Sequence, residues 1–156
     1  MKSKEIVTLK NYTTLAMRTC LPSCKNKEYA IWGYNSEWHE LQSKLYGYKA
    51  KKIRGDSEEK LSEIEKQIID EIGDCFWFIA LKCTLAKLNF EHIYKTKSKD
   101  LINLTNEELN IKSKIDSLRE ICKDWETAVL TCLRANIKKL SSRKERGVIT
   151  GNGDYR

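Results

Sequence analysis

The sequence has little of what tight turns and membrane spans require. Its 156 residues include one proline, Pro22, and only seven glycines. A β-sandwich or barrel needs many tight turns, so this scarcity argues against both and favours long helices. No apolar run approaches the roughly 20 residues that a bilayer-spanning helix needs. The N-terminal residues MKSKEIVTLK do not resemble a signal peptide. We therefore expect no membrane contact and a cytoplasmic protein.

Acidic residues are outnumbered, with 22 Asp and Glu against 29 Lys and Arg, for a net charge of +7. A basic balance indicates a polyanionic partner, either nucleic acid or free nucleotides, and charge alone does not separate these. The length suits a single domain, residues 1–156, with a substantial core.

The six cysteines do not form a recognisable metal-binding pattern. Four of them lie within apolar helical patterns and are interpreted as core thiols in a reducing compartment: Cys75, Cys83, Cys122 and Cys132. Cys20 and Cys24 could supply half of a zinc site. Because no second Cys/His pair has ligand spacing, free thiols are the favoured interpretation.

Hydrophobic periodicity predicts three long helices after a short helical segment within residues 3–19. The first spans about 29–52, and the second runs from about 57 through 86 towards Tyr94. The third begins at a capping box, Thr105 to Glu108, and continues to Arg146. If the second helix reaches Tyr94, its length of about 38 residues corresponds to roughly 57 Å. That length exceeds the width of a domain of this size. We therefore predict an all-α fold, an antiparallel helical bundle of the four-helix type, assembled as a homodimer or homotetramer.

Two acidic pairs carry the functional argument. Glu37 and Glu40 lie three residues apart in the first helix, and Glu71 and Asp74 lie three apart in the second. This spacing puts both carboxylates of a pair on one helix face, and neither pair contains a basic residue. Packing one helix on the other would gather four carboxylates, which suit a hard divalent cation such as Mg²⁺.

Both pairs lie at the margin of an apolar stripe. The two acids of each pair are about 60° and 120° from the centre of their stripe. Such acids can face a neighbouring helix, as a metal site within a bundle requires, or can form the solvated border of the stripe. Gly73 favours the first interpretation, because a glycine inside a helix usually marks a close backbone approach.

The apolar stripe of the third helix runs to Cys132, and beyond it the same face carries an amide and cations. These are Asn136, Lys139, Arg143 and Arg146. Cations that converge on a carboxylate–metal site would hold a polyphosphate whose charge the metal only partly neutralises. Alternatively, the helix leaves the bundle here and these side chains face solvent. The sequence does not separate the two.

Taken in order, these segments resemble the MazG-like nucleotide pyrophosphohydrolases, an all-α family. Glu-x-x-Glu at 37–40 precedes the Glu-Ile-Gly-Asp-Cys-Phe-Trp-Phe-Ile-Ala segment at 71–80, and Asn-x-x-Lys follows at 136–139. The basic stretch 51–54 resembles the end of the family's first helix. The tail 147–156 resembles a branch often carried by phages, and 95–125 looks like an insertion that lengthens two helices.

The resemblance implies hydrolysis of nucleoside or deoxynucleoside triphosphates to the monophosphate and pyrophosphate, with Mg²⁺ or Mn²⁺. It implies catalytic and metal-ligating roles for Glu37, Glu40, Glu71 and Asp74. Substrate contacts would come from Asn136, Lys139, Arg143, Arg146 and Lys52, with Phe78 and Tyr48 as candidates for the base. Aromatic residues at helical spacing are also typical of core, so the last two remain open. A phage-encoded member would act in the host cytoplasm.

The alternative is a non-enzymatic basic helical protein that binds nucleic acid or a protein partner. It accounts for the charge of +7 but not for two matched acidic pairs, which would repel a phosphate backbone. We therefore do not expect nucleic acid as the partner. A third hypothesis is hydrolysis of a signalling nucleotide in place of a canonical triphosphate.

Overall fold

A computed structural model describes residues 5–148 of the chain. In chain order its helices are α1 (Tyr12–Met17), η1 (Pro22–Cys24), α2 (Lys27–Arg54), α3 (Glu58–Ala86), α4 (Phe90–Lys95), η2 (Ser98–Asn103), α5 (Asn106–Asp124) and α6 (Val129–Glu145). No strand occurs in this part of the chain, which confirms the all-α prediction. None of its helices combines the length and apolar character needed to cross a bilayer.

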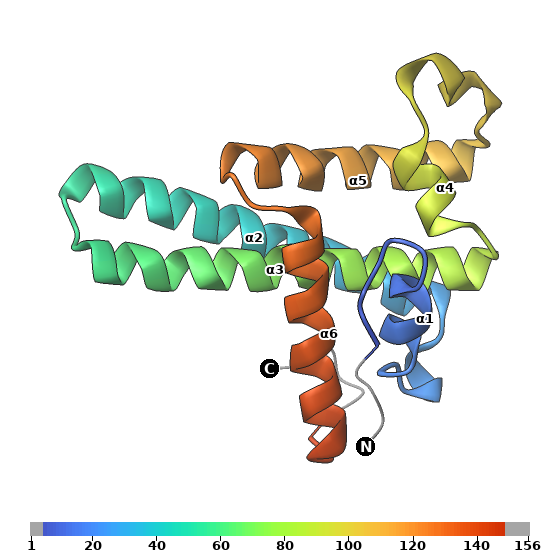
Figure 1. Cartoon of the computed structure of the whole chain (residues 1–156), viewed down its shortest axis with the longest axis horizontal. Helices are drawn as coiled ribbons and strands as arrows, with labels where there is room; N and C mark the ends of the chain where they lie inside the picture. The colour runs from blue at the N-terminus through green and yellow to red at the C-terminus, as the bar shows by residue number, and fades with distance from the viewer. Residues whose placement is uncertain (1–4, 149–156) are drawn as a thin grey trace.

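The long helices α2 and α3 form an antiparallel hairpin (Figure 1). Asn26 caps α2, with its side chain accepting from the Tyr29 N–H, and Ser57 caps α3 by accepting from the Lys60 N–H. Between them Gly55 adopts φ +83°, a conformation that glycine reaches without strain and that commonly ends a helix. The predicted helices at about 29–52 and 57–86 are present, and a short turn at 55–57 joins them.

The prediction that the second helix continues towards Tyr94 is wrong. Lys87 adopts φ +58°, and the Leu88 N–H donates to the Cys83 carbonyl at 2.8 Å, so α3 ends at Ala86. The chain then turns into α4, which buries Phe90 and Ile93. Burial of these two side chains offsets the free-energy cost of the left-handed conformation at Lys87, which is not a glycine.

The third predicted helix is two helices. α5 ends at Asp124, Glu126 adopts φ +50°, and the Thr127 N–H donates to the Cys122 carbonyl at 2.9 Å. The prediction of one continuous helix from Thr105 to Arg146 is therefore wrong, although its capping box at Thr105 is present. Figure 1 shows the consequence: α5 runs along the hairpin, whereas α6 crosses it. The 95–125 segment supplies η2 and α5.

α3 is the centre of the core, because α1, α2, α5 and α6 all contact it. Its buried side chains point in several directions. Trp77, for example, donates to Thr19 Oγ1 at 3.0 Å on the side of α1. All six cysteines are buried free thiols, as predicted. α3 is thus enclosed by its neighbours, and any polar side chain on its inner faces needs a specific partner.

Candidate metal centre

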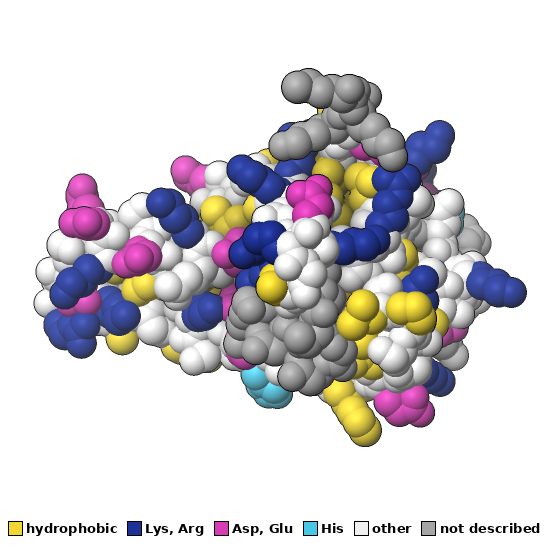
Figure 2. Space-filling view, turned by 90° about the horizontal axis from the view of Figure 1, so that it is seen from below, with side chains coloured by type: hydrophobic (Ala, Val, Ile, Leu, Met, Phe, Trp, Pro, Cys, Tyr) yellow, Lys and Arg dark blue, Asp and Glu magenta, His cyan; other side chains and the backbone are white. Residues whose placement is uncertain are grey.

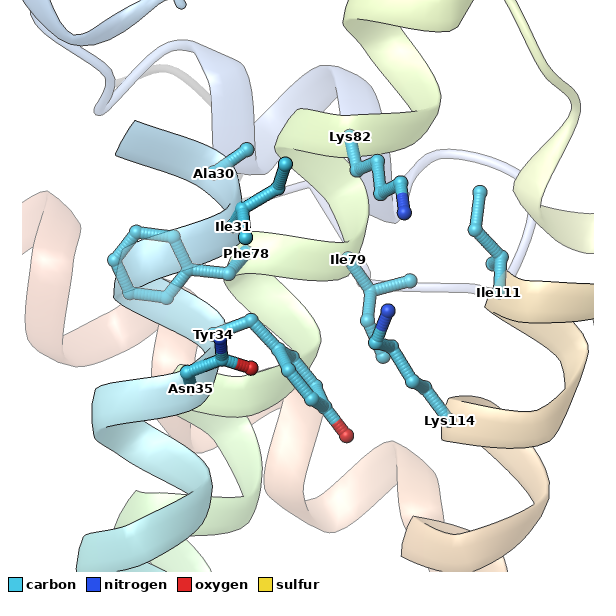
Figure 3. A pocket seen from close by; sticks show the side chains of 9 residues that line it. All are labelled: Ala30, Ile31, Tyr34, Asn35, Phe78, Ile79, Lys82, Ile111 and Lys114. Atoms are coloured by element: carbon cyan, nitrogen blue, oxygen red, sulfur yellow. The ribbon is translucent and has the colours of Figure 1, made fainter. Parts of the chain in front are cut away.

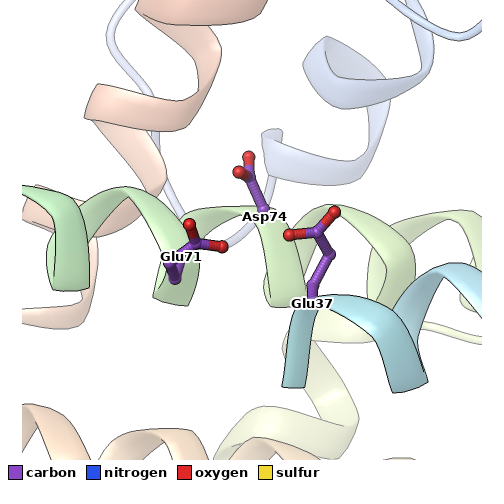
Figure 4. A group of neighbouring side chains, drawn as sticks. All are labelled: Glu37, Glu71 and Asp74. Atoms are coloured by element: carbon purple, nitrogen blue, oxygen red, sulfur yellow. The ribbon is translucent and has the colours of Figure 1, made fainter. Parts of the chain in front are cut away.

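Three of the four predicted acids meet where α2 packs on α3. One carboxylate oxygen each from Glu37, Glu71 and Asp74 lies within 4.8 Å of the other two (Figure 4). Glu37 comes from α2, and the other two come from successive turns of α3. Glu37 and Glu71 are only 5% and 4% exposed, so they are not the solvated border of a stripe. Such burial is unusual for carboxylates and requires compensation.

Glu40 lies one turn further along α2 and is half-buried. It stands outside the group of three, but its charge acts on the same volume. Burial is the first cause that raises the pKa of the Cys75 thiol, and the charges of Glu37, Asp74, Glu71 and Glu40 raise it further. The charges of all four predicted acids therefore act on the Cys75 thiol.

Gly73 brings α6 against this part of α3. A β-carbon at Gly73 would lie 2.9 Å from Asn136 Cβ and 3.0 Å from the Cys132 carbonyl oxygen. These distances are too short for real contacts, so only glycine permits this approach of α6 to α3. The close backbone approach expected from the sequence is present.

At this crossing, two side chains of α6 hold Asp74. Asn136 Nδ2 donates to Asp74 Oδ1 at 3.1 Å, and Lys139 Nζ lies 2.7 and 2.8 Å from the two Asp74 oxygens. Asn136 is fully buried, and its Oδ1 accepts from the Tyr12 hydroxyl at 2.9 Å. Burial raises the pKa of Tyr12, so the hydroxyl remains a donor and fixes the orientation of the amide.

Lys44 is a site residue that the sequence reasoning missed. Its ammonium group forms an ion pair with Glu71 across the α2–α3 interface. A usable signal was present, because Lys44 lies seven residues after Glu37 and four after Glu40, hence on the same face of α2. The search for basic residues was confined to the interior of each acidic pair.

The cluster retains an excess of negative charge. Burial, and after it the nearby Asp74, Glu71 and Glu40, together raise the pKa of Glu37 from 4.5 to about 8. Burial also raises the pKa of Asp74, while Lys139 opposes that rise. With every acid ionised, the four carboxylates exceed the two ammonium groups of Lys44 and Lys139 by two charges. One divalent cation would balance them.

The donor set fits a hard cation. All the candidate ligand atoms are carboxylate oxygens, which suit Mg²⁺ or Mn²⁺ better than zinc. Glu71 Oε2 is buried, and once the Glu37 carboxyl has lost its proton no hydrogen-bond donor reaches this oxygen within residues 5–148. A buried acceptor in this condition is costly, and a cation would relieve that cost.

Three of the other predicted substrate residues lie away from the cluster. Arg146 is exposed and bonds to the Ser142 carbonyl of its own helix, and Lys52 is exposed. Tyr48 donates to Glu65 Oε1 and packs on Trp125. The two remaining residues are Arg143, which is half-buried, and Phe78.

Phe78 is a core residue. It is 2% exposed, and a β-carbon at Gly33 would lie 2.1 Å from its ring. The ring therefore fills the space that Gly33 leaves at the α2–α3 interface, one turn along from Glu37 and Asp74. Residues 149–156, most of the predicted tail, lie outside the described part of the chain.

Comparisons with protein-family models, with curated proteins and with solved structures found no match for this chain. The case for a function therefore rests on the geometry of the cluster.

Proposed function

We propose that this protein is a Mg²⁺- or Mn²⁺-dependent nucleotide pyrophosphohydrolase of the MazG-like kind, acting on nucleoside or deoxynucleoside triphosphates in the cytoplasm. The observation that carries the proposal is the convergence of Glu37, Glu71 and Asp74 with Lys139 and Asn136 of α6 bound to Asp74. Buried carboxylates in negative excess favour a divalent cation, and adjacent ammonium groups favour an anionic substrate.

Each side chain has a role that follows from its position. Glu37, Glu71 and Asp74 would hold the cation, with Glu40 beside them. The cation would supply a Lewis acid that offsets phosphate charge. Lys44 and Lys139 are 33% and 18% exposed, so their ammonium groups are accessible to phosphate oxygens. Asn136 and Tyr12 orient Asp74 from the buried side.

A second copy of the chain would complete a four-helix bundle. One face of α2 is exposed and uncharged over seven positions with alternating spacings of four and three: Trp32, Ser36, His39, Ser43, Tyr46, Ala50 and Ile53. Trp32, Tyr46 and Ile53 are 71%, 70% and 89% exposed. This heptad spacing is typical of helices that pair side by side. We propose that α2 pairs through this stripe in a homodimer or homotetramer.

The activity is tested with a panel of NTPs and dNTPs plus Mg²⁺, including signalling nucleotides, with release of pyrophosphate as the readout. We expect cleavage of at least one nucleotide and a loss of at least 100-fold in Glu71→Gln, the order of effect of removing a key electrostatic group. Glu63→Gln is the matched control, because Glu63 is an exposed acid of the same helix. If no nucleotide is cleaved, or the two variants behave alike, the proposal fails.

The second candidate is a basic helical protein that binds nucleic acid or a protein partner. One observation favours it: Lys44 and Lys139 partly neutralise the acids from within, so the cluster would repel a phosphate backbone less than the sequence suggested. Against it, Figure 2 shows basic side chains mixed with acidic ones over the face it presents. Binding to DNA or RNA that weakens steeply with salt, with no nucleotide cleaved, would support this candidate.

A further inference from the structure

A second cluster of charged groups lies along α3, away from the acids. Lys82 follows Asp74 by eight residues, about 12 Å along the helix. A small pocket between α2, α3 and α5 is lined by Lys82 together with Lys114 of α5 and Tyr34 of α2. Figure 3 shows the two lysine side chains entering it from different helices, with their amino groups towards each other.

The two ammonium groups share one neutral acceptor. Lys82 Nζ and Lys114 Nζ donate to Asn110 Oδ1 at 3.0 and 2.6 Å. In residues 5–148 neither of them forms an ion pair with a carboxylate. This contrasts with Lys112, two residues before Lys114 and on a different face of α5, whose ammonium pairs with Asp116 at 2.9 Å. Two cations held together by a single amide oxygen repel each other.

The surroundings make that repulsion costly. Lys114 Nζ lies 5.1 Å from the centroid of the Tyr34 ring, so part of its environment is aromatic and not water. Burial, and after it the neighbouring Lys82, together lower the pKa of Lys114 to about 8. Glu108, the acid that begins α5 nearby, is committed to capping the backbone at Thr105. Glu107, three residues before Asn110 on α5, is exposed, and no carboxylate forms an ion pair with Lys82 or Lys114 in residues 5–148.

We propose that Lys82, Lys114 and Asn110 form a binding site for a phosphate-class oxyanion, distinct from the acidic cluster. The Lys82 and Lys114 ammonium groups donate to oxyanion oxygens, and the anion relieves the repulsion between them. The cavity measures about 30 Å³, the share of about one water. The site therefore takes one phosphate group at its mouth and does not enclose a whole nucleotide. That group can come from inorganic phosphate or from the phosphate end of a nucleotide.

Thermal melting without divalent metal tests the proposal. The wild-type chain is melted in EDTA with increasing inorganic phosphate at constant ionic strength set by chloride. We expect a saturable rise in Tm of about 3–6 °C at ten times the dissociation constant. Lys114→Met and Lys82→Gln should each weaken the response at least tenfold. Lys114→Met keeps an unbranched side chain over Tyr34 and removes a repelling charge, so its Tm without phosphate should equal or exceed that of the wild type.

Two matched controls separate this site from general screening and from the acidic cluster. The double variant Lys66→Gln/Lys123→Gln removes two charges at exposed positions of the same two helices, and it should keep the full response. Lys139→Met removes the cation beside Asp74 and should also keep it. Loss of the response in either control, or an equal response to chloride, overturns the proposal.

The source of the phosphate group is resolved with AMP in the same assay. A response to AMP as strong as that to inorganic phosphate supports the site and identifies the terminal phosphate of a nucleotide as a ligand. A response to inorganic phosphate alone supports the site as one for the free anion. The absence of any response to either ligand at about 20 mM, which would reveal a dissociation constant as weak as about 1 mM, overturns the proposal. None of these outcomes depends on nucleotide cleavage.

Discussion

Replacing Glu37 with glutamine should affect stability in opposite directions with and without a divalent cation. Burial and three neighbouring acids raise the pKa of Glu37 from 4.5 to about 8. Such a rise corresponds to at most about 4.8 kcal/mol. Because solvent reaches part of the cluster and screens its charges, we expect a stability effect of less than half this upper bound, ~2 kcal/mol.

The sign follows from proton binding. Between pH 4.5 and about 8 the folded chain keeps a proton on Glu37 that the unfolded chain has lost. The free energy of unfolding therefore falls as pH rises through this window. The stability that protonated Glu37 adds to the folded chain is fully present only below pH 4.5. Glutamine cannot ionise, so Glu37→Gln should lack this decline. In EDTA at pH 9 the variant should be more stable than the wild type by about 2 kcal/mol, or ~4–8 °C in Tm.

The assay is urea or thermal unfolding at pH 5 and pH 9, in EDTA and in excess Mg²⁺ or Mn²⁺. In the presence of metal the wild type should gain stability and release about one proton per site below pH 8, which calorimetry in buffers of different ionisation enthalpy detects. Glu37→Gln should lose most of that gain, and Glu63→Gln, an exposed acid, should retain it. The reasoning is refuted if Glu37→Gln follows the same pH dependence as the wild type in EDTA.

Three further substitutions test the packing around the acidic cluster and the proposed pairing of α2 between two copies. Gly73→Ala places a β-carbon 3.0 Å from the Cys132 carbonyl oxygen. Despite a gain of about 1 kcal/mol in helix propensity, it should therefore lower the free energy of unfolding by about 1–2 kcal/mol in urea melts; an unchanged or higher value contradicts the close approach. Tyr12→Phe removes the donor that fixes Asn136. It should cost about 1–3 kcal/mol and weaken Mn²⁺ binding several-fold by calorimetry, whereas unchanged affinity would show that the amide needs no anchor. Ala50→Arg puts a charge in the middle of the exposed α2 stripe and should shift the wild-type dimer or tetramer to monomer in light scattering; a monomeric wild type would disprove the pairing.

Local signals predicted much of the site correctly. The i, i+3 spacing of each acidic pair put both carboxylates on one face, and Gly73 indicated that another helix comes close. Asn136 and Lys139 reach Asp74, although the prediction relied on a continuous third helix that does not exist. The prediction still named the right side chains because residues 132–139 all belong to α6. The period of this one helix sets which of its side chains face α3.

Two other predicted substrate residues lie in surroundings that the helical period did not indicate. Phe78 has the helical position of a substrate residue, but Gly33 on a neighbouring helix opens a space that its ring fills. Arg146 follows Lys139 on the same face, yet it lies beyond the crossing and is exposed. A helical period gives the direction of a side chain but not where the neighbouring helix ends.

The sequence by itself determined the helical character of the chain, most helix starts, the acidic pairs and the glycine between the second pair of acids. These depend on caps, propensities and periods, which act over a few residues. Only the tertiary structure decided where α3 and α5 end, at left-handed Lys87 and Glu126, and that Lys44 pairs with Glu71. Neither left-handed residue is a glycine, so no local signal marks the break. Burial of distant side chains stabilises it, and that burial exists only once the helices have packed.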